Sequence, residues 1–188
     1  MIVPLIIFAV VVLLPVVWVV VQYNSLVSLR NYIRESWSNV DTELKRRYDL
    51  IPNLVATVKG YAAHEREVLE QVTALRNRCL ANTGRPVDQA KDENQLVDAL
   101  KRLLVVVENY PQLKADQHYL QLQKELVNTE DRIQAARRFY NGNVRDYRNK
   151  CETFPSNLVA QGFGFQPEEF FSVPPAVKEV PDVDFQPG

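Results

Sequence analysis

The chain has 188 residues and a formal net charge of −1, because 22 lysines and arginines are matched by 23 aspartates and glutamates. This balance excludes a polybasic nucleic-acid-binding protein, and we expect no nucleic acid among the partners. The length suits one modest domain with an appendage. The charges are unevenly placed, since residues 1–22 contain none.

The uncharged N-terminal segment predicts a transmembrane helix over residues 1–22. Residues 2–21, at about 1.5 Å per residue, reach about 30 Å, which is the thickness of the hydrocarbon core of a bilayer. The alternative is a cleaved signal peptide, which requires basic residues before the apolar run and small residues near its end. The sequence has neither. We therefore expect a single-pass protein anchored in the lipid bilayer through residues 2–21.

The first cations after this segment are Arg30 and Arg34, and no lysine or arginine precedes it. Positively charged flanks remain preferentially on the cytoplasmic side of a membrane. This asymmetry points the rest of the chain toward the cytoplasm.

Residues 23–154 predict an elongated helical bundle, because apolar residues recur at spacings of three and four. The first helix continues directly from the membrane segment and is expected to end at the cationic residues 45–47. The second restarts around Pro52 and carries a heptad-like seam, typical of a coiled coil, as far as Cys79. The third ends before Pro111, and the fourth runs from there to near Phe154.

The fold class predicted from these patterns is all-α. An N-terminal transmembrane helix continues into an elongated antiparallel four-helix bundle, followed by an extended Pro-rich C-terminal tail. Residues 155–171, rich in glycine and phenylalanine, are expected to dock on the bundle, because so many aromatic rings need a groove. Residues 172–188 are expected to form an acidic, proline-rich, extended tail. The alternative is a disordered tail that begins earlier.

The sequence offers few residues that suggest catalysis or metal binding. His64 is followed by Glu65, but position 68 is valine rather than the second histidine of a zinc-protease helix. We expect no catalytic residue, cofactor or metal. Cys79 and Cys151 are interpreted as packed thiols, with a disulfide left open. Carboxylates near the helix seams are expected to pair with Arg76 or Arg137 rather than to bind metal; these are Glu65, Glu125 and Glu130.

Two groups of residues are predicted to bind a partner. The first is the basic run Lys45, Arg46 and Arg47, for which charge placed at a helix end is the alternative. The second is aromatic and comprises Phe163, Phe165, Phe170 and Phe171.

Long stretches of the sequence resemble the LemA family of bacterial membrane proteins. They include KRRYDLIPNLVATVKGYA, ENYPQLKA, LQLQKELVNTEDRIQAARRFYNGNVRDYRN and FPSNLVAQGFGF. The resemblance implies a single-pass protein of the bacterial inner membrane with a helical bundle and no established catalytic activity. It also implies relatives in magnetosome formation, suspected roles in envelope maintenance and a link with a membrane-bound zinc protease.

Two functions are therefore expected. The first is a non-enzymatic, membrane-anchored scaffold of the cell envelope that forms homo-oligomers. The alternative is an accessory or regulatory subunit that binds a membrane enzyme such as a membrane protease.

Overall fold

The computed structural model describes residues 2–172, with the backbone alone at residues 2, 3 and 5–9. Within residues 2–172 the chain is all-helical, with no β-strand. The helices are α1 (Ile2–Tyr61), α2 (Arg66–Ala81), α3 (Pro86–Glu108), α4 (Pro111–Lys114), α5 (Gln117–Glu152) and α6 (Ser156–Gly162). The structure confirms the predicted all-α class, with a long apolar N-terminal helix and bundle-like packing. From residue 173 onward, the predicted tail lies outside the described residues.

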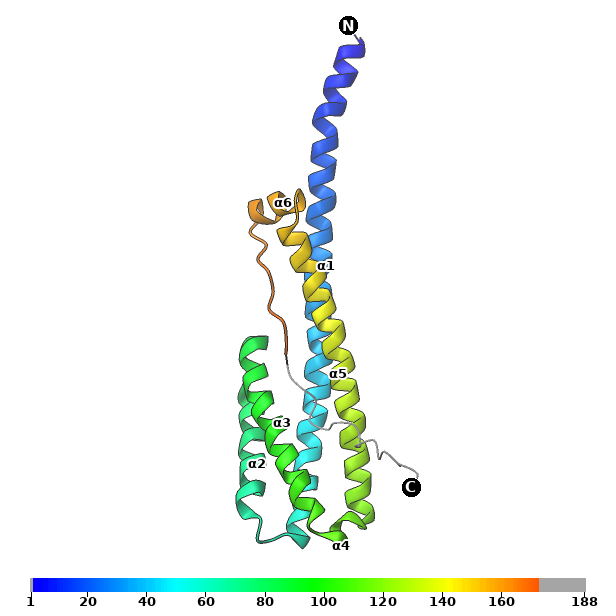
Figure 1. Cartoon of the computed structure of the whole chain (residues 1–188). Helices are drawn as coiled ribbons and strands as arrows, with labels where there is room; N and C mark the ends of the chain where they lie inside the picture. The colour runs from blue at the N-terminus through cyan, green and yellow to red at the C-terminus, as the bar shows by residue number, and fades with distance from the viewer. Residues whose placement is uncertain (1, 173–188) are drawn as a thin grey trace, which may run out of the picture. The chain divides into compact units, whose positions relative to one another are not determined.

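The described residues divide into two compact units. The first unit contains residues 2–40 and 136–170, and the second contains residues 41–135 and 171–172. Helices α1 and α5 contribute to both. In the first unit, the C-terminal part of α5 runs antiparallel to α1, and α6 folds back against α1 (Figure 1). In the second unit, α2 and α3 form a helical hairpin beside the C-terminal part of α1 (Figure 1).

The N-terminal part of α1 is apolar and largely exposed. From Val10 to Val21 its large side chains are mostly exposed, although every one of them is apolar. A soluble helix would keep such residues against a core and would present polar residues to water. Length and composition therefore fit a membrane anchor, and this helix is the candidate span among the described residues.

Pro52 does not begin a helix, so the predicted break before it is wrong. Helix α1 passes through Pro52 and ends at Tyr61. A proline inside a helix lacks the N–H that would bond to the carbonyl four residues earlier, here that of Tyr48. Arg76 of α2 donates its Nε–H to that carbonyl oxygen at 2.8 Å. A side chain from the neighbouring helix thus replaces the missing backbone donor, and the helix continues.

The predicted fourth helix is interrupted near its start. Asp116 separates the short α4 from α5, and its carboxylate accepts a hydrogen bond from the backbone N–H of Tyr119 at 2.9 Å. This is the N-terminal cap that an aspartate supplies to a new helix. The hydroxyl of Tyr61 also donates to Asp116, at 2.9 Å, and fixes the turn beside the end of α1.

Candidate functional site

The three residues of the predicted basic run have different environments. Lys45 and Arg46 are exposed, and each lies near a carboxylate of its own helix, at 2.7 Å from Asp41 and 3.7 Å from Glu43 respectively. Arg47 is fully buried. Partner binding stays a prediction for Lys45 and Arg46, whereas Arg47 is committed to the interior of the second unit.

Arg47 is the centre of a buried charge cluster that joins three helices. Its Nη1 lies 2.9 Å from a carboxylate oxygen of Glu130 on α5, and its Nη2 contacts Glu93 on α3. The hydroxyl of Tyr48 donates to the second carboxylate oxygen of Glu93. Both glutamates are almost fully buried. One guanidinium therefore serves two carboxylates from two other helices.

The charges of this cluster hold one another in place. Burial alone would lower the pKa of the Arg47 guanidinium, but the carboxylates of Glu93 and Glu130 raise it above its ordinary value. Burial and the Glu93 carboxylate raise the pKa of the Tyr48 phenol. The same two causes raise the pKa of the Cys79 thiol, which lies buried beside them as a free cysteine. The neutral forms of the phenol and the thiol are thus favoured in this cluster.

The sequence contains an indication of this cluster that the apolar spacing alone did not reveal. Arg47 follows Leu44 by three residues and precedes Ile51 by four, so it occupies a seam position of α1. Glu93 stands in the same way three residues before Leu96 on the apolar face of α3. Charged residues at two seam positions predict a buried ion pair, although only the fold shows that they meet.

The seam carboxylates singled out from the sequence have structural partners. Glu130 pairs with Arg47, and Glu65 accepts a hydrogen bond from the Tyr110 hydroxyl at 3.1 Å. Arg76, the partner expected for such a carboxylate, donates to the Tyr48 carbonyl instead. Within the described residues, no group of three or more His, Cys, Asp or Glu side chains is arranged to hold a metal ion.

The aromatic residues predicted to bind a partner are also divided between burial and exposure. In the first unit, Phe165 is buried, with the Arg30 guanidinium 5.1 Å from its ring centroid, while Phe163 is largely exposed. Phe170 is partly exposed beneath the Arg148 guanidinium, at 5.4 Å. Phe171 is fully buried and belongs to the second unit. Partner binding by these residues stays a prediction.

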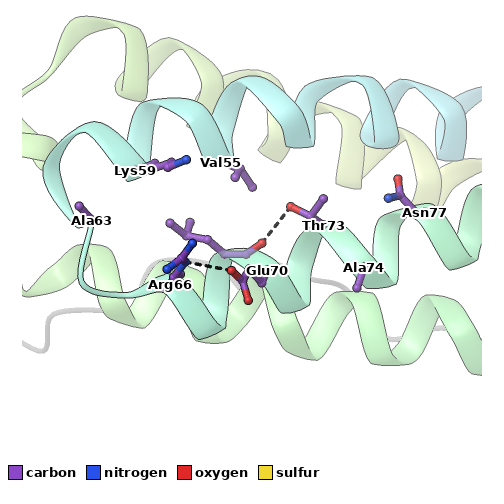
Figure 2. A pocket seen from close by; sticks show the side chains of 9 residues that line it. Val55, Lys59, Ala63, Arg66, Glu70, Thr73, Ala74 and Asn77 are labelled. Atoms are coloured by element: carbon purple, nitrogen blue, oxygen red, sulfur yellow. Dashed lines mark hydrogen bonds and ion pairs between the residues drawn. The ribbon is translucent and has the colours of Figure 1, made fainter.

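An open groove lies between the C-terminal part of α1 and α2, entirely within the second unit. Its volume is about 560 Å³. Figure 2 shows Val55 and Lys59 on the α1 side and Arg66, Glu70 and Thr73 on the α2 side. The Arg66 guanidinium pairs with the Glu70 carboxylate at 3.1 Å along the same helix. The lining thus combines apolar side chains such as Val55 and Leu69 with charged and polar ones.

Comparison with known proteins agrees with this architecture. The sequence profile of the LemA family matches residues 36–185. The chain belongs to the LemA family. The matched region contains the whole buried charge cluster and the groove, and it begins after the apolar N-terminal segment.

The relatives of this LemA-family chain include proteins named LemA and MamQ. The chain is 31% identical over 139 residues to Protein LemA of Metamycoplasma hominis, covering 73% of the chain and 63% of that relative. It is 27% identical over 180 residues to Magnetosome protein MamQ 1 of Paramagnetospirillum magneticum, covering 82% of the chain and 66% of the relative. The chain thus spans slightly less than two thirds of the length of these relatives. Neither name describes a catalytic activity.

Proposed function

We propose that this LemA-family chain is a non-enzymatic, membrane-anchored helical scaffold of the bacterial cell envelope that self-assembles at the membrane. Anchoring is through residues 2–21 in the inner membrane, with the bundle on the cytoplasmic side beside Arg30 and Arg34. The observation that carries the proposal is helix α1, which extends from the uncharged segment to Tyr61 without a break. The same helix contributes to the anchor and to the packed helices.

The use of charge in the second unit supports a structural role. Arg47, Glu93 and Glu130 are buried against one another and join α1, α3 and α5. A catalytic group must reach a substrate, whereas these groups are enclosed and committed to holding helices together. Buried ionic groups of this kind are best known for fixing helix register.

Self-assembly is tested by expressing two differently tagged copies of the full chain in one cell and crosslinking them before lysis. The proposal expects each tag to capture the other, and mass spectrometry to map the crosslinks to residues of the bundle. Mixing separately expressed copies only after solubilisation is the control. A detergent-purified chain that is monomeric over a wide concentration range, with no crosslinks between copies in cells, contradicts self-assembly. A tightly bound metal or cofactor in the purified chain would contradict the non-enzymatic role.

The groove between α1 and α2 favours a second candidate, an accessory subunit of a membrane enzyme such as a membrane protease. Ala74 lines the groove, whereas Gln71 is exposed on the same helix without lining it. If a partner occupies the groove, Ala74→Trp should abolish capture of a membrane protein from native membranes, and Gln71→Trp should preserve it. Equal capture by both variants, or crosslinks between copies alone, contradicts this alternative.

A further inference from the structure

The turn that contains α6 is uncharged and exposes large apolar side chains. Residues 153–167 contain no Asp, Glu, Lys, Arg or His. Within them, Phe154 is 74% exposed, and Leu158 and Phe163 are each 58% exposed. A soluble surface rarely presents several large apolar side chains so close together without a partner.

This turn lies beside the base of the apolar segment, in the same compact unit. The ring of Tyr23 on α1 is 5.0 Å from the ring of Phe163 and 5.5 Å from that of Phe165, both in edge-on geometry. Figure 1 shows α6 folded against α1 just below the N-terminal part of that helix. The guanidinium of Arg30, the first charged residue of α1, lies over the ring of Phe165.

The position of Tyr23 sets the depth of the turn. If residues 2–21 span the hydrocarbon core, Tyr23 lies about 3 Å beyond it along the helix axis. The headgroup region extends roughly 5–8 Å beyond the hydrocarbon core on each side of the bilayer. Phe163, in ring contact with Tyr23, therefore falls within that region.

Charged residues reappear where the chain leaves the level of Tyr23. Glu168 and Glu169 are the first charges after the turn, and the carbonyl oxygen of Glu169 accepts a hydrogen bond from the Tyr140 hydroxyl at 2.9 Å. Tyr140 packs on Trp37, with ring centroids 5.2 Å apart. Trp37 is fourteen residues after Tyr23, or about 21 Å farther along α1. The uncharged turn is thus bounded by Glu152 at the end of α5 and by Glu168 and Glu169 after it.

We propose that the α6 turn is a second membrane contact, in which Phe154, Leu158 and Phe163 insert into the headgroup region of the bilayer beside the span. The occupant of this surface is lipid, because the surface continues directly from the apolar segment at interfacial depth. Aromatic side chains are the residues that favour this layer. The inference rests on the proposed membrane anchor. A contact on the flank of the span would restrict the tilt of α1.

Tryptophan fluorescence of the full chain in lipid vesicles tests the proposal. Trp18 and Trp37 are replaced by Phe, and one tryptophan is introduced as Phe163→Trp or, independently, as Phe154→Trp. The matched control is Phe139→Trp, since Phe139 is exposed to 61% in the same unit but neighbours Tyr140 at the level of Trp37. A chain that keeps Trp18 and carries Trp37→Phe reports on the anchor itself. The vesicles contain phosphatidylethanolamine, phosphatidylglycerol and a phosphatidylcholine brominated near the carbonyl end of its acyl chains.

The proposal expects the brominated lipid to reduce emission at positions 163 and 154 roughly twofold, because interfacial rings reach the acyl-chain boundary. The Phe139→Trp control should respond to aqueous acrylamide and not to the lipid. If Trp18 is quenched by lipid while positions 163 and 154 respond only to acrylamide, the second contact is overturned and the anchor stands. Protection of both positions from lipid and acrylamide indicates a protein contact, such as a second copy, and also overturns it. If the brominated lipid does not quench the emission of Trp18, both the membrane anchor and the second membrane contact are contradicted.

Discussion

The two units pack α1 against α5 by different means. In the first unit Trp37 of α1 packs on Tyr140 of α5, and in the second Arg47 of α1 pairs with Glu130 of α5 and also with Glu93 of α3. Ring packing contributes apolar burial and tolerates small shifts. A buried guanidinium that pairs with two carboxylates is more sensitive to displacement of a helix, because a buried charge left without a partner is strongly destabilising. We interpret the second unit as the part that fixes the register of the bundle, and the first as the part adapted to the bilayer.

The largest expected effect comes from breaking the ionic contact. Arg47→Met leaves two buried carboxylates without their cation and should lower the free energy of unfolding by about 3–5 kcal/mol. Urea unfolding of the detergent-solubilised chain, followed by circular dichroism, measures the change. Arg46→Met is the matched control and should change the free energy of unfolding by less than about 0.5 kcal/mol, because Arg46 is exposed.

A compensated variant sharpens this prediction. Adding Glu93→Gln and Glu130→Gln to Arg47→Met removes the unpaired charges and should restore part of the lost stability. A single Arg47→Met variant as stable as the parent would contradict the register role of the cluster.

The aromatic region is tested by a pair of phenylalanines that differ in burial. Phe165→Ala removes a buried ring and should cost about 3 kcal/mol of unfolding free energy. Phe163→Ala removes an exposed ring whose main protein contact is Tyr23, and should cost about 1 kcal/mol or less in detergent. Limited proteolysis after residue 154 should accelerate for the first variant and change little for the second. Equal proteolysis of both would mean that the turn is not docked through Phe165.

A smaller effect is expected where α1 passes through Pro52. Arg76→Leu leaves the Tyr48 carbonyl without its donor and should cost about 1–2 kcal/mol. Pro52→Ala supplies a backbone N–H to that carbonyl, so Arg76→Leu should cost less in the Pro52→Ala background. A double-mutant cycle by urea unfolding measures this coupling. Additive effects of the two substitutions would show that Arg76 does not replace the missing donor.

The smallest expected effect is a pH dependence in the hairpin of α2 and α3. Partial burial would raise the pKa of the Asp92 carboxyl, but hydrogen bonds from Arg78 and Asn82 hold it below its ordinary value of 3.8. A carboxyl whose pKa is lower in the folded than in the unfolded state contributes stability above pH 3.8, and this stability is lost as the pH falls through the folded-state pKa. Asp92→Asn should therefore flatten the acid side of the stability profile. An unchanged acid profile would contradict the role of these hydrogen bonds.

Much of this organisation could be predicted from the sequence, because it depends on local pattern. The uncharged stretch over residues 1–22 and the recurring apolar spacing lead directly to an apolar helix followed by helices that shield one another. The turn at residues 82–85 separates α2 from α3, as Gly84 and the following Pro86 suggest.

The errors arise where a distant residue decides the local structure. Pro52 signals a helix start by itself, and the donor that lets α1 continue belongs to Arg76 on another helix. Arg47 looks like surface charge within the run KRR, and its burial depends on Glu93 and Glu130, which are remote in sequence. The α6 helix is short and lies between prolines and glycines that favour turns, so its sequence alone gave little sign of it.

The proposed scaffold requires that the chain stay in the membrane, anchored by its N-terminal segment. The most direct test is the intact mass of the polypeptide recovered from membranes washed with alkaline carbonate. We expect the chain to stay in the washed membranes with residues 2–21 present. A polypeptide that begins after Gln22 and is released into the soluble fraction would contradict it.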